Sequence, residues 1–106
     1  MDEQFMYDSL SEIAEALGDC NSNPISASLL CLRHGLTFDD KGKIVVAFNS
    51  VLREKSFDDL SVDLFGQAFE KVVLKAKEYA DVVVIAFIKA FARNYIVELV
   101  PFSRTL

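Results

Sequence analysis

A chain of 106 residues, 52% of them hydrophobic, is long enough for one domain with one core and too apolar for a disordered acidic segment. Its net charge of −5 argues against nucleic acid as a direct ligand, because neutralising phosphates requires clustered Lys and Arg. The charge is unevenly placed, with −6 in residues 1–32 (six acids, no base) and +1 in residues 33–106 (ten acids, eleven bases).

The first predicted element is a helix over about residues 3–17. Its apolar residues recur at spacings of four, three and four and form one stripe: Met6, Leu10, Ile13 and Leu17. The opposite side carries three acids at i, i+4 and i+7, namely Asp8, Glu12 and Glu15. Like charges at this spacing repel by roughly 0.2–0.5 kcal/mol per pair. Gly18 is suited to end the helix, which places Asp19 in the following loop.

A second helix is predicted over residues 24–34. Asn23 is a good capping residue, and Pro24 suits the first helical position. The expected buried side consists of Ile25, Leu29 and Leu32. Gly35 follows the last turn and ends the helix.

A short repeat of the form [ST]-F-D-D occurs at residues 37–40 and again at 56–59. Both copies match the capping box that precedes an apolar run, so each predicts a helix start. The first helix would run through Lys55, although a hairpin with residues 43–48 as a strand is an alternative. The second helix would begin near residue 57 and bury one stripe: Phe65, Phe69, Val72, Ala76 and Tyr79.

The last third of the chain is the most ambiguous. Within residues 82–96, helical spacing is kept by Val84, Ile88, Phe91 and Tyr95, with Asp81 as the expected cap and Phe91 as an expected core residue. Four β-branched residues at 82–85 instead favour a strand over 82–88. Residues 95–100 are compatible with a short strand or with a frayed helix end closed by Pro101. The sequence therefore predicts a single all-α domain over residues 1–106, an irregular bundle of four to five helices. The alternative is an α+β fold with a small sheet from 43–48, 82–88 or 95–100.

Catalytic and metal-binding patterns are weak. The chain has one His and two Cys, Cys20 and Cys31, which are ten residues apart in no metal or redox motif and are expected to be small core residues. His34 falls in a last helical turn, where the helix dipole already explains it. We therefore expect no enzyme activity, no metal and no cofactor.

Targeting signals are also weak. The acidic N-terminus does not resemble a secretory signal. The longest uncharged apolar run, residues 82–88, is shorter than the ~20 residues that cross a bilayer. One Cys pair is no disulfide framework, so a cytoplasmic location without membrane association is expected.

The acidic residues are the one pattern that predicts a function. They are candidates for binding a basic protein by imitating an array of phosphates: Asp8, Glu12, Glu15, Asp19, Asp39, Asp40, Asp58 and Asp59. In its size, acidity and expected lack of cofactor, the chain resembles inhibitors of basic nucleases, such as immunity proteins, antitoxins and phage anti-defence proteins. The resemblance implies a protein that occludes the active site of a basic toxin. The alternative function is a structural or assembly subunit, such as a homodimer.

Overall fold

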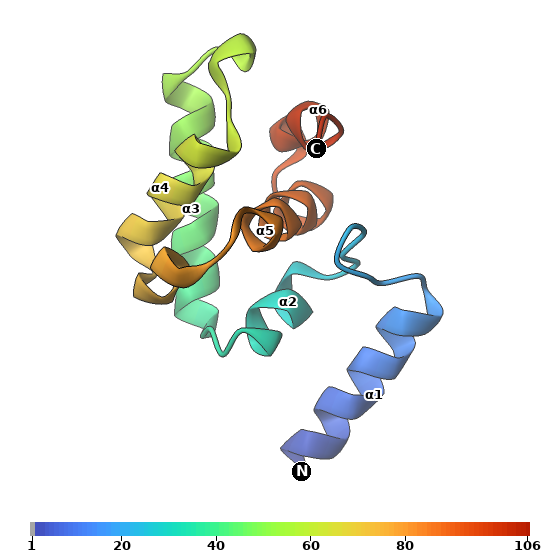
Figure 1. The fold of residues 1–106 in the computed structure, drawn as a ribbon. Coiled ribbons are helices and arrows are strands. Elements are labelled where there is room, and N and C mark those ends of the chain that lie inside the picture. Colours follow the sequence, from blue (N-terminus) through green and yellow to red (C-terminus); the bar gives the residue numbers. More distant parts are fainter. Residues whose placement is uncertain (1) are drawn as a thin grey trace.

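A computed structural model of the protein describes residues 2–106 and shows a helical globule with one projecting helix (Figure 1). Six α-helices occur in these residues: α1 (Glu3–Ala16), α2 (Ala27–Arg33), α3 (Phe38–Glu54), α4 (Val62–Val72), α5 (Asp81–Asn94) and α6 (Val100–Ser103). Three short 3-10 helices connect them: η1 (Phe57–Asp59), η2 (Leu74–Glu78) and η3 (Val97–Leu99). The all-α prediction is confirmed, and the number of helices is six instead of four to five.

The core is built around α5, which lies between the α3–α4 pair and the helices α2 and α6 (Figure 1). Seven of the fourteen residues of α5 are buried, which explains why its sequence is apolar on nearly every side. Phe48 of α3 packs edge-on against the rings of Phe65, Phe69 and Phe91, at centroid distances of 5.3, 5.9 and 5.8 Å. The predicted core residues Phe65, Phe69 and Phe91 are all fully buried.

Helix α1 extends away from this globule (Figure 1). Its ends are defined locally, because the Asp2 side chain accepts a hydrogen bond from the Phe5 N–H (3.1 Å) and Gly18 has a φ of +94°. Such a φ is favourable only for glycine, so Gly18 ends the helix as predicted. Only Ala14 among the residues of α1 is buried. The bounds of the first predicted helix are confirmed, but its packing on a core is not.

The start of α2 differs from the prediction of residues 24–34. The helix begins at Ala27, and the Ser26 hydroxyl caps it by accepting from the Leu29 N–H (3.1 Å). Asn23 instead closes a tight turn with Cys20 through two backbone hydrogen bonds of 3.0 and 3.3 Å. Asn23 therefore belongs to this turn, four residues before the first residue of α2. Pro24 also lies in the loop that precedes the helix.

The two copies of [ST]-F-D-D have different outcomes. Thr37 forms the predicted capping box with Asp40 at the start of α3, and residues 43–48 are helical, which contradicts the hairpin alternative. At the second copy, the Ser56 hydroxyl donates to the Asp59 carboxylate (2.9 Å) and caps no backbone N–H. Only the 3-10 turn η1 follows it, and α4 begins at Val62 with Ser61 as its cap.

In the C-terminal third, residues 82–88 lie within α5, and residues 95–100 form a turn followed by η3 and the start of α6, so the strands considered for 82–88 and 95–100 are contradicted. Asp81 is the first residue of α5 and not its cap, because the preceding Ala80 is the extended residue. Pro101 lies in the first turn of α6 and does not terminate the chain's helices. Proline is tolerated there because the first N–H groups of a helix have no partner within the helix.

Candidate functional site

The acidic face of α1 is fully available to a partner. Asp8, Glu12 and Glu15 are exposed, and no Lys or Arg among residues 2–106 forms an ion pair with them. The one polar contact is a hydrogen bond from the Gln4 amide to Asp8 (2.9 Å). Three unpaired carboxylates on one helix face attract positive charge and accelerate association with a basic surface.

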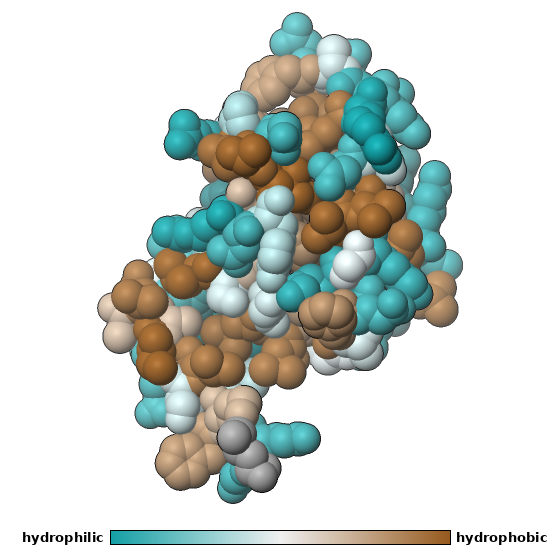
Figure 2. Space-filling view, turned by 180° about the vertical axis from the view of Figure 1, so that it is seen from behind, coloured by the Kyte–Doolittle hydropathy of each residue, from teal (hydrophilic) through white to brown (hydrophobic). Residues whose placement is uncertain are grey.

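The apolar stripe of α1 is exposed as well. Met6, Leu10, Ile13 and Leu17 retain 45%, 47%, 59% and 66% exposure, and Phe5 near the tip retains 72%. Helix α1 is the projecting arm of the molecule. In Figure 2 its apolar residues are visible at the lower left of the view, and the apolar surface continues onto the body of the protein. Contiguous exposed apolar patches are uncommon on folded monomeric proteins, so this stripe is a candidate interaction surface. The sequence correctly placed these side chains on one side of the helix, and the described chain covers them only in part.

A shallow apolar groove of about 350 Å³ lies between α1 and the segment around α2. Leu10, Ile13 and Leu17 form one wall, and Ile25, Leu29 and Leu32 contribute the other. Leu32, which was expected on the buried side of its helix, is 49% exposed here because α1 leaves this side open. The groove and the stripe on α1 therefore form one continuous apolar surface, and the α1 carboxylates lie on the opposite side of the helix.

Asp19 has an intramolecular role. Its carboxylate forms an ion pair with Arg33 (2.7 Å) and accepts a hydrogen bond from the Ile25 N–H (2.8 Å). Burial alone would raise the pKa of Asp19, but the Ile25 N–H and the Arg33 guanidinium outweigh it and hold the pKa below its ordinary value. This contact ties the end of α1 to α2 and leaves little of the Asp19 side chain exposed.

The remaining four candidate acids lie elsewhere. Asp39 pairs with Lys43 (3.2 Å), and Asp40 accepts from the Thr37 N–H (2.9 Å), which lowers the pKa of Asp40. Asp58 and Asp59 belong to η1, at the end of the molecule opposite to α1 (Figure 1). The eight acids therefore form no single surface, and the three on α1 are exposed on the side of that helix opposite to its apolar stripe.

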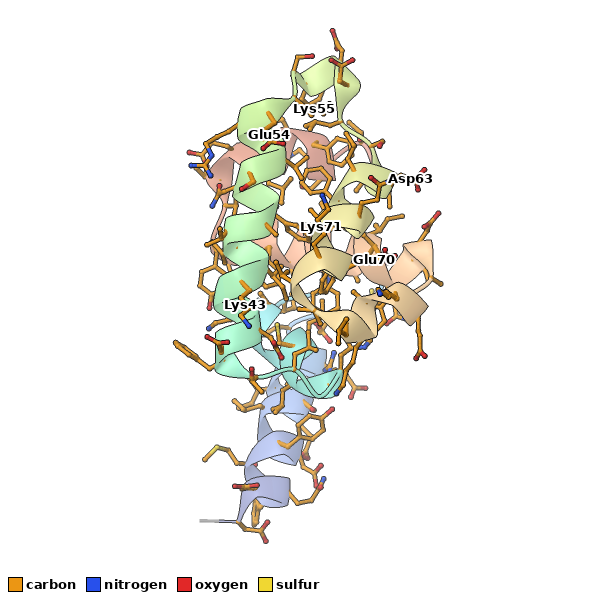
Figure 3. The ribbon with its side chains drawn as sticks, turned by 90° about the vertical axis from the view of Figure 1, so that its left-hand side faces the viewer. Lys43, Glu54, Lys55, Asp63, Glu70 and Lys71 are labelled. Atoms are coloured by element: carbon orange, nitrogen blue, oxygen red, sulfur yellow. The ribbon has the colours of Figure 1, made fainter. Side chains whose placement is uncertain are left out.

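A second groove, of about 330 Å³, separates α3 from α4. Figure 3 shows acids and bases side by side along this face: Lys43, Glu54, Lys55, Asp63, Glu70 and Lys71. Alternating charges of this kind favour no particular sign of partner charge. The positive charge of Lys71 on α4 is thus offset by carboxylates on the same face.

The residues with catalytic potential are dispersed. Burial raises the pKa of the Cys31 thiol to about 11, so this thiol stays protonated at neutral pH. Cys20 is exposed, contrary to the expectation of a core position, and a hydrogen bond with the Ser22 hydroxyl lowers its pKa. His34 packs against the rings of Tyr79 and Phe87, and burial lowers its pKa. Within residues 2–106, no three His, Cys, Asp or Glu side chains are grouped to hold a metal ion.

Sequence reasoning missed one polar cluster, in which Lys41, Ser28 and Tyr95 come within hydrogen-bond distance of one another. Ser28 and Lys41 are 13 positions apart in the sequence, Lys41 and Tyr95 are 54 apart, and Ser28 and Tyr95 are 67 apart. No local motif could therefore have revealed the cluster.

Among the helices of residues 2–106, none combines the length and the apolar composition required to cross a membrane. Comparison of the chain with protein-family models, with curated proteins and with solved structures found no match.

Proposed function

We propose that this protein is a small inhibitor that binds a basic protein partner, such as a nuclease toxin, and blocks its active site through α1. The observation that carries the proposal is the combined exposure of an apolar stripe and an unpaired acidic face on one projecting helix. The apolar stripe would supply the buried anchors, and the carboxylates would steer the encounter. This role requires neither a catalytic residue nor a cofactor.

The energetics of α1 support a partner. A helix of 14 residues is only marginally stable by itself in water, and most helices in proteins depend on burial of their apolar side. Here that side is exposed, and the like charges of Asp8, Glu12 and Glu15 destabilise the helix further. A basic partner that encloses α1 would correct both defects, because it would bury the stripe on one side of the helix and neutralise the carboxylates on the other.

The alternative role, an assembly subunit that forms homodimers, is favoured by the same apolar stripe. Charge argues against it as the main role, because each copy brings six acids and no base in residues 1–32. Two such segments face to face would repel each other, whereas a basic partner would be attracted. Sedimentation equilibrium of the purified protein distinguishes these cases, since a homodimer predicts a mass that doubles with concentration.

The test compares three baits in affinity enrichment from a lysate of the native host: the wild-type protein, an arm variant and a control variant. The arm variant replaces Asp8, Glu12 and Glu15 with Lys. The matched control makes the same change of charge at exposed acids outside α1, namely Glu54, Glu78 and Glu98. We expect a basic protein to bind the wild type and the control, and to be lost from the arm variant.

The captured protein is then purified, and its association rate is measured at increasing ionic strength. Steering by the α1 carboxylates predicts a rate that falls with salt for the wild type and changes little for the arm variant. A second variant, Ile13→Asp, removes an apolar anchor and is expected to accelerate dissociation. The proposal is wrong if both the arm variant and Ile13→Asp bind the partner as the wild type does.

A further inference from the structure

A donor-rich polar cluster lies where α2, α3 and the end of α5 meet. The Lys41 ammonium is 3.1 Å from the Ser28 hydroxyl and 3.0 Å from the Tyr95 hydroxyl, and the two hydroxyl oxygens are 3.2 Å apart. No carboxylate among residues 2–106 forms an ion pair with Lys41. The three groups come from distant parts of the chain, so the tertiary fold alone creates this site.

Counting hydrogens shows that the cluster has donors to spare. The ammonium has three hydrogens, of which two point to the hydroxyls of Ser28 and Tyr95. Only one hydroxyl hydrogen can lie between the two oxygens, so the other points elsewhere. One ammonium hydrogen and one hydroxyl hydrogen therefore have no acceptor within residues 2–106 and are open to a ligand or to water, and the ammonium also lies 5.0 Å from the centroid of the Tyr95 ring. The hydrogen bond from Lys41 also lowers the pKa of Tyr95, as expected for a phenol beside a cation.

An apolar recess of about 220 Å³ adjoins this cluster. Ser28 and Lys41 line one part of it, and the rest is formed mainly by Cys31, Leu32, Leu36 and Phe38. The Phe38 ring is 84% exposed and lies with its centroid 4.9 Å from the Lys41 ammonium. An aromatic ring in that place shields the cation from water on one side and forms a cation–π contact.

We propose that this recess binds a small monocarboxylate with a short apolar tail. The carboxylate would accept hydrogen bonds from Lys41 and from the spare hydroxyl hydrogen, and the tail would lie against Leu32, Leu36 and Phe38. A volume of 220 Å³ corresponds to about seven water molecules at ~30 Å³ each, which suits a ligand of about that many non-hydrogen atoms. A single cation in apolar surroundings favours a monoanion over phosphate, which is better matched by several cations or by Arg. The recess adjoins the groove beside α1, with which it shares Ser28 and Leu32, but its cation belongs to this cluster alone.

Isothermal titration calorimetry with hexanoate tests the assignment directly. Loss of a charge-assisted hydrogen bond predicts that Lys41→Met weakens hexanoate binding by about tenfold or more. The matched control is Lys43→Met, two residues along the same helix, where the ammonium already pairs with Asp39. We expect the control to bind hexanoate like the wild type. Hexanol, which lacks the charge, is expected to bind at least tenfold more weakly than hexanoate.

Tyr95→Phe provides a second variant in case Lys41→Met fails to fold, as judged by circular dichroism. It removes one hydroxyl without changing the charge, and it should weaken hexanoate several-fold. The inference is overturned if hexanoate does not bind at millimolar concentration, or if Lys43→Met weakens it as much as Lys41→Met. Tighter binding of inorganic phosphate than of hexanoate would overturn the ligand class. An unchanged affinity in both Lys41→Met and Tyr95→Phe would reduce the cluster to a structural contact.

Discussion

Truncation of Phe69 is the most direct test of the core. The ring is fully buried on α4, and its centroid lies 4.8 Å from Phe87, 5.6 Å from Tyr79 and 5.9 Å from Phe48. Replacement of a buried Phe by Ala costs about 3–5 kcal/mol through lost transfer free energy and the cavity left behind. Each aromatic pair adds about 0.5–1.5 kcal/mol, which places Phe69→Ala at the upper end of that range.

A domain of this size has a free energy of unfolding of about 5–15 kcal/mol, so Phe69→Ala removes a large share of it. If the alanine variant does not fold, Phe69→Leu keeps most of the volume and should cost roughly 0.5–3 kcal/mol. The matched control is Phe57→Ala on η1, where the ring is 54% exposed and little apolar area is lost.

Urea unfolding followed by the helical circular dichroism signal measures all three variants. We expect the urea midpoint to be lowered least by Phe57→Ala, more by Phe69→Leu and most by Phe69→Ala. The slope of the free energy of unfolding against urea concentration should be nearly the same for all three. A cost below about 1 kcal/mol for Phe69→Ala would refute the packing of α4 on α5 described above. The same conclusion would follow if Phe57→Ala were as destabilising as Phe69→Leu.

Three further predictions concern local structure and are measured by the same unfolding experiment. Ser61→Ala should lower the free energy of unfolding by about 0.5–2 kcal/mol because Ser61 caps α4. Ser56→Ala should lower it by less, because Ser56 caps no helix. Equal losses for the two variants would contradict the observed start of α4. Gly42→Ala should stabilise α3 by up to about 1 kcal/mol, since a Cβ at residue 42 meets nothing within 4 Å. Gly18→Ala should destabilise the fold, because the φ of Gly18 is +94°. A change in the free energy of unfolding of the same sign for both variants would refute this reasoning. The lowered pKa of Asp19 stabilises the fold above its unfolded pKa of about 3.9, and this stability is lost as the pH falls through the lower folded pKa. Asp19→Asn should therefore weaken the fold at neutral pH and make its acid sensitivity shallower, and an unchanged acid profile would contradict the ion pair.

Much of the local structure is predictable because its causes lie within a few residues. The cap at Thr37 and the glycine ends at Gly18 and Gly35 depend on hydrogen bonds and φ values that the immediate sequence dictates. Helical spacing also identified Phe65 and Phe91 as core residues. The starts of α2 and α4 were predicted too early, because equally good capping signals occur at residues 23–24 and 56–59, and the sequence does not show which signal will be used.

The candidate site required the tertiary structure. A helical stripe such as Leu10 and Ile13 shows that α1 has an apolar side, but only the fold shows that the described chain covers it only in part. The same holds for charge. Asp19 and Glu12 look alike in the sequence, but Asp19 forms an ion pair and Glu12 is an unpaired surface group.

By itself, the sequence favoured the helical class and gave the bounds of α1, α3 and α5 to within about two residues, together with the acidity of the first third of the chain, because spacing, caps and charge act over one or two turns. Tertiary structure decided which surfaces are buried and which distant side chains meet. Lys41 and Tyr95 are 54 residues apart, and their contact exists because α2, α3 and α5 converge on the same core. Burial and long-range contact are properties of the whole packing arrangement, and no local pattern encodes them.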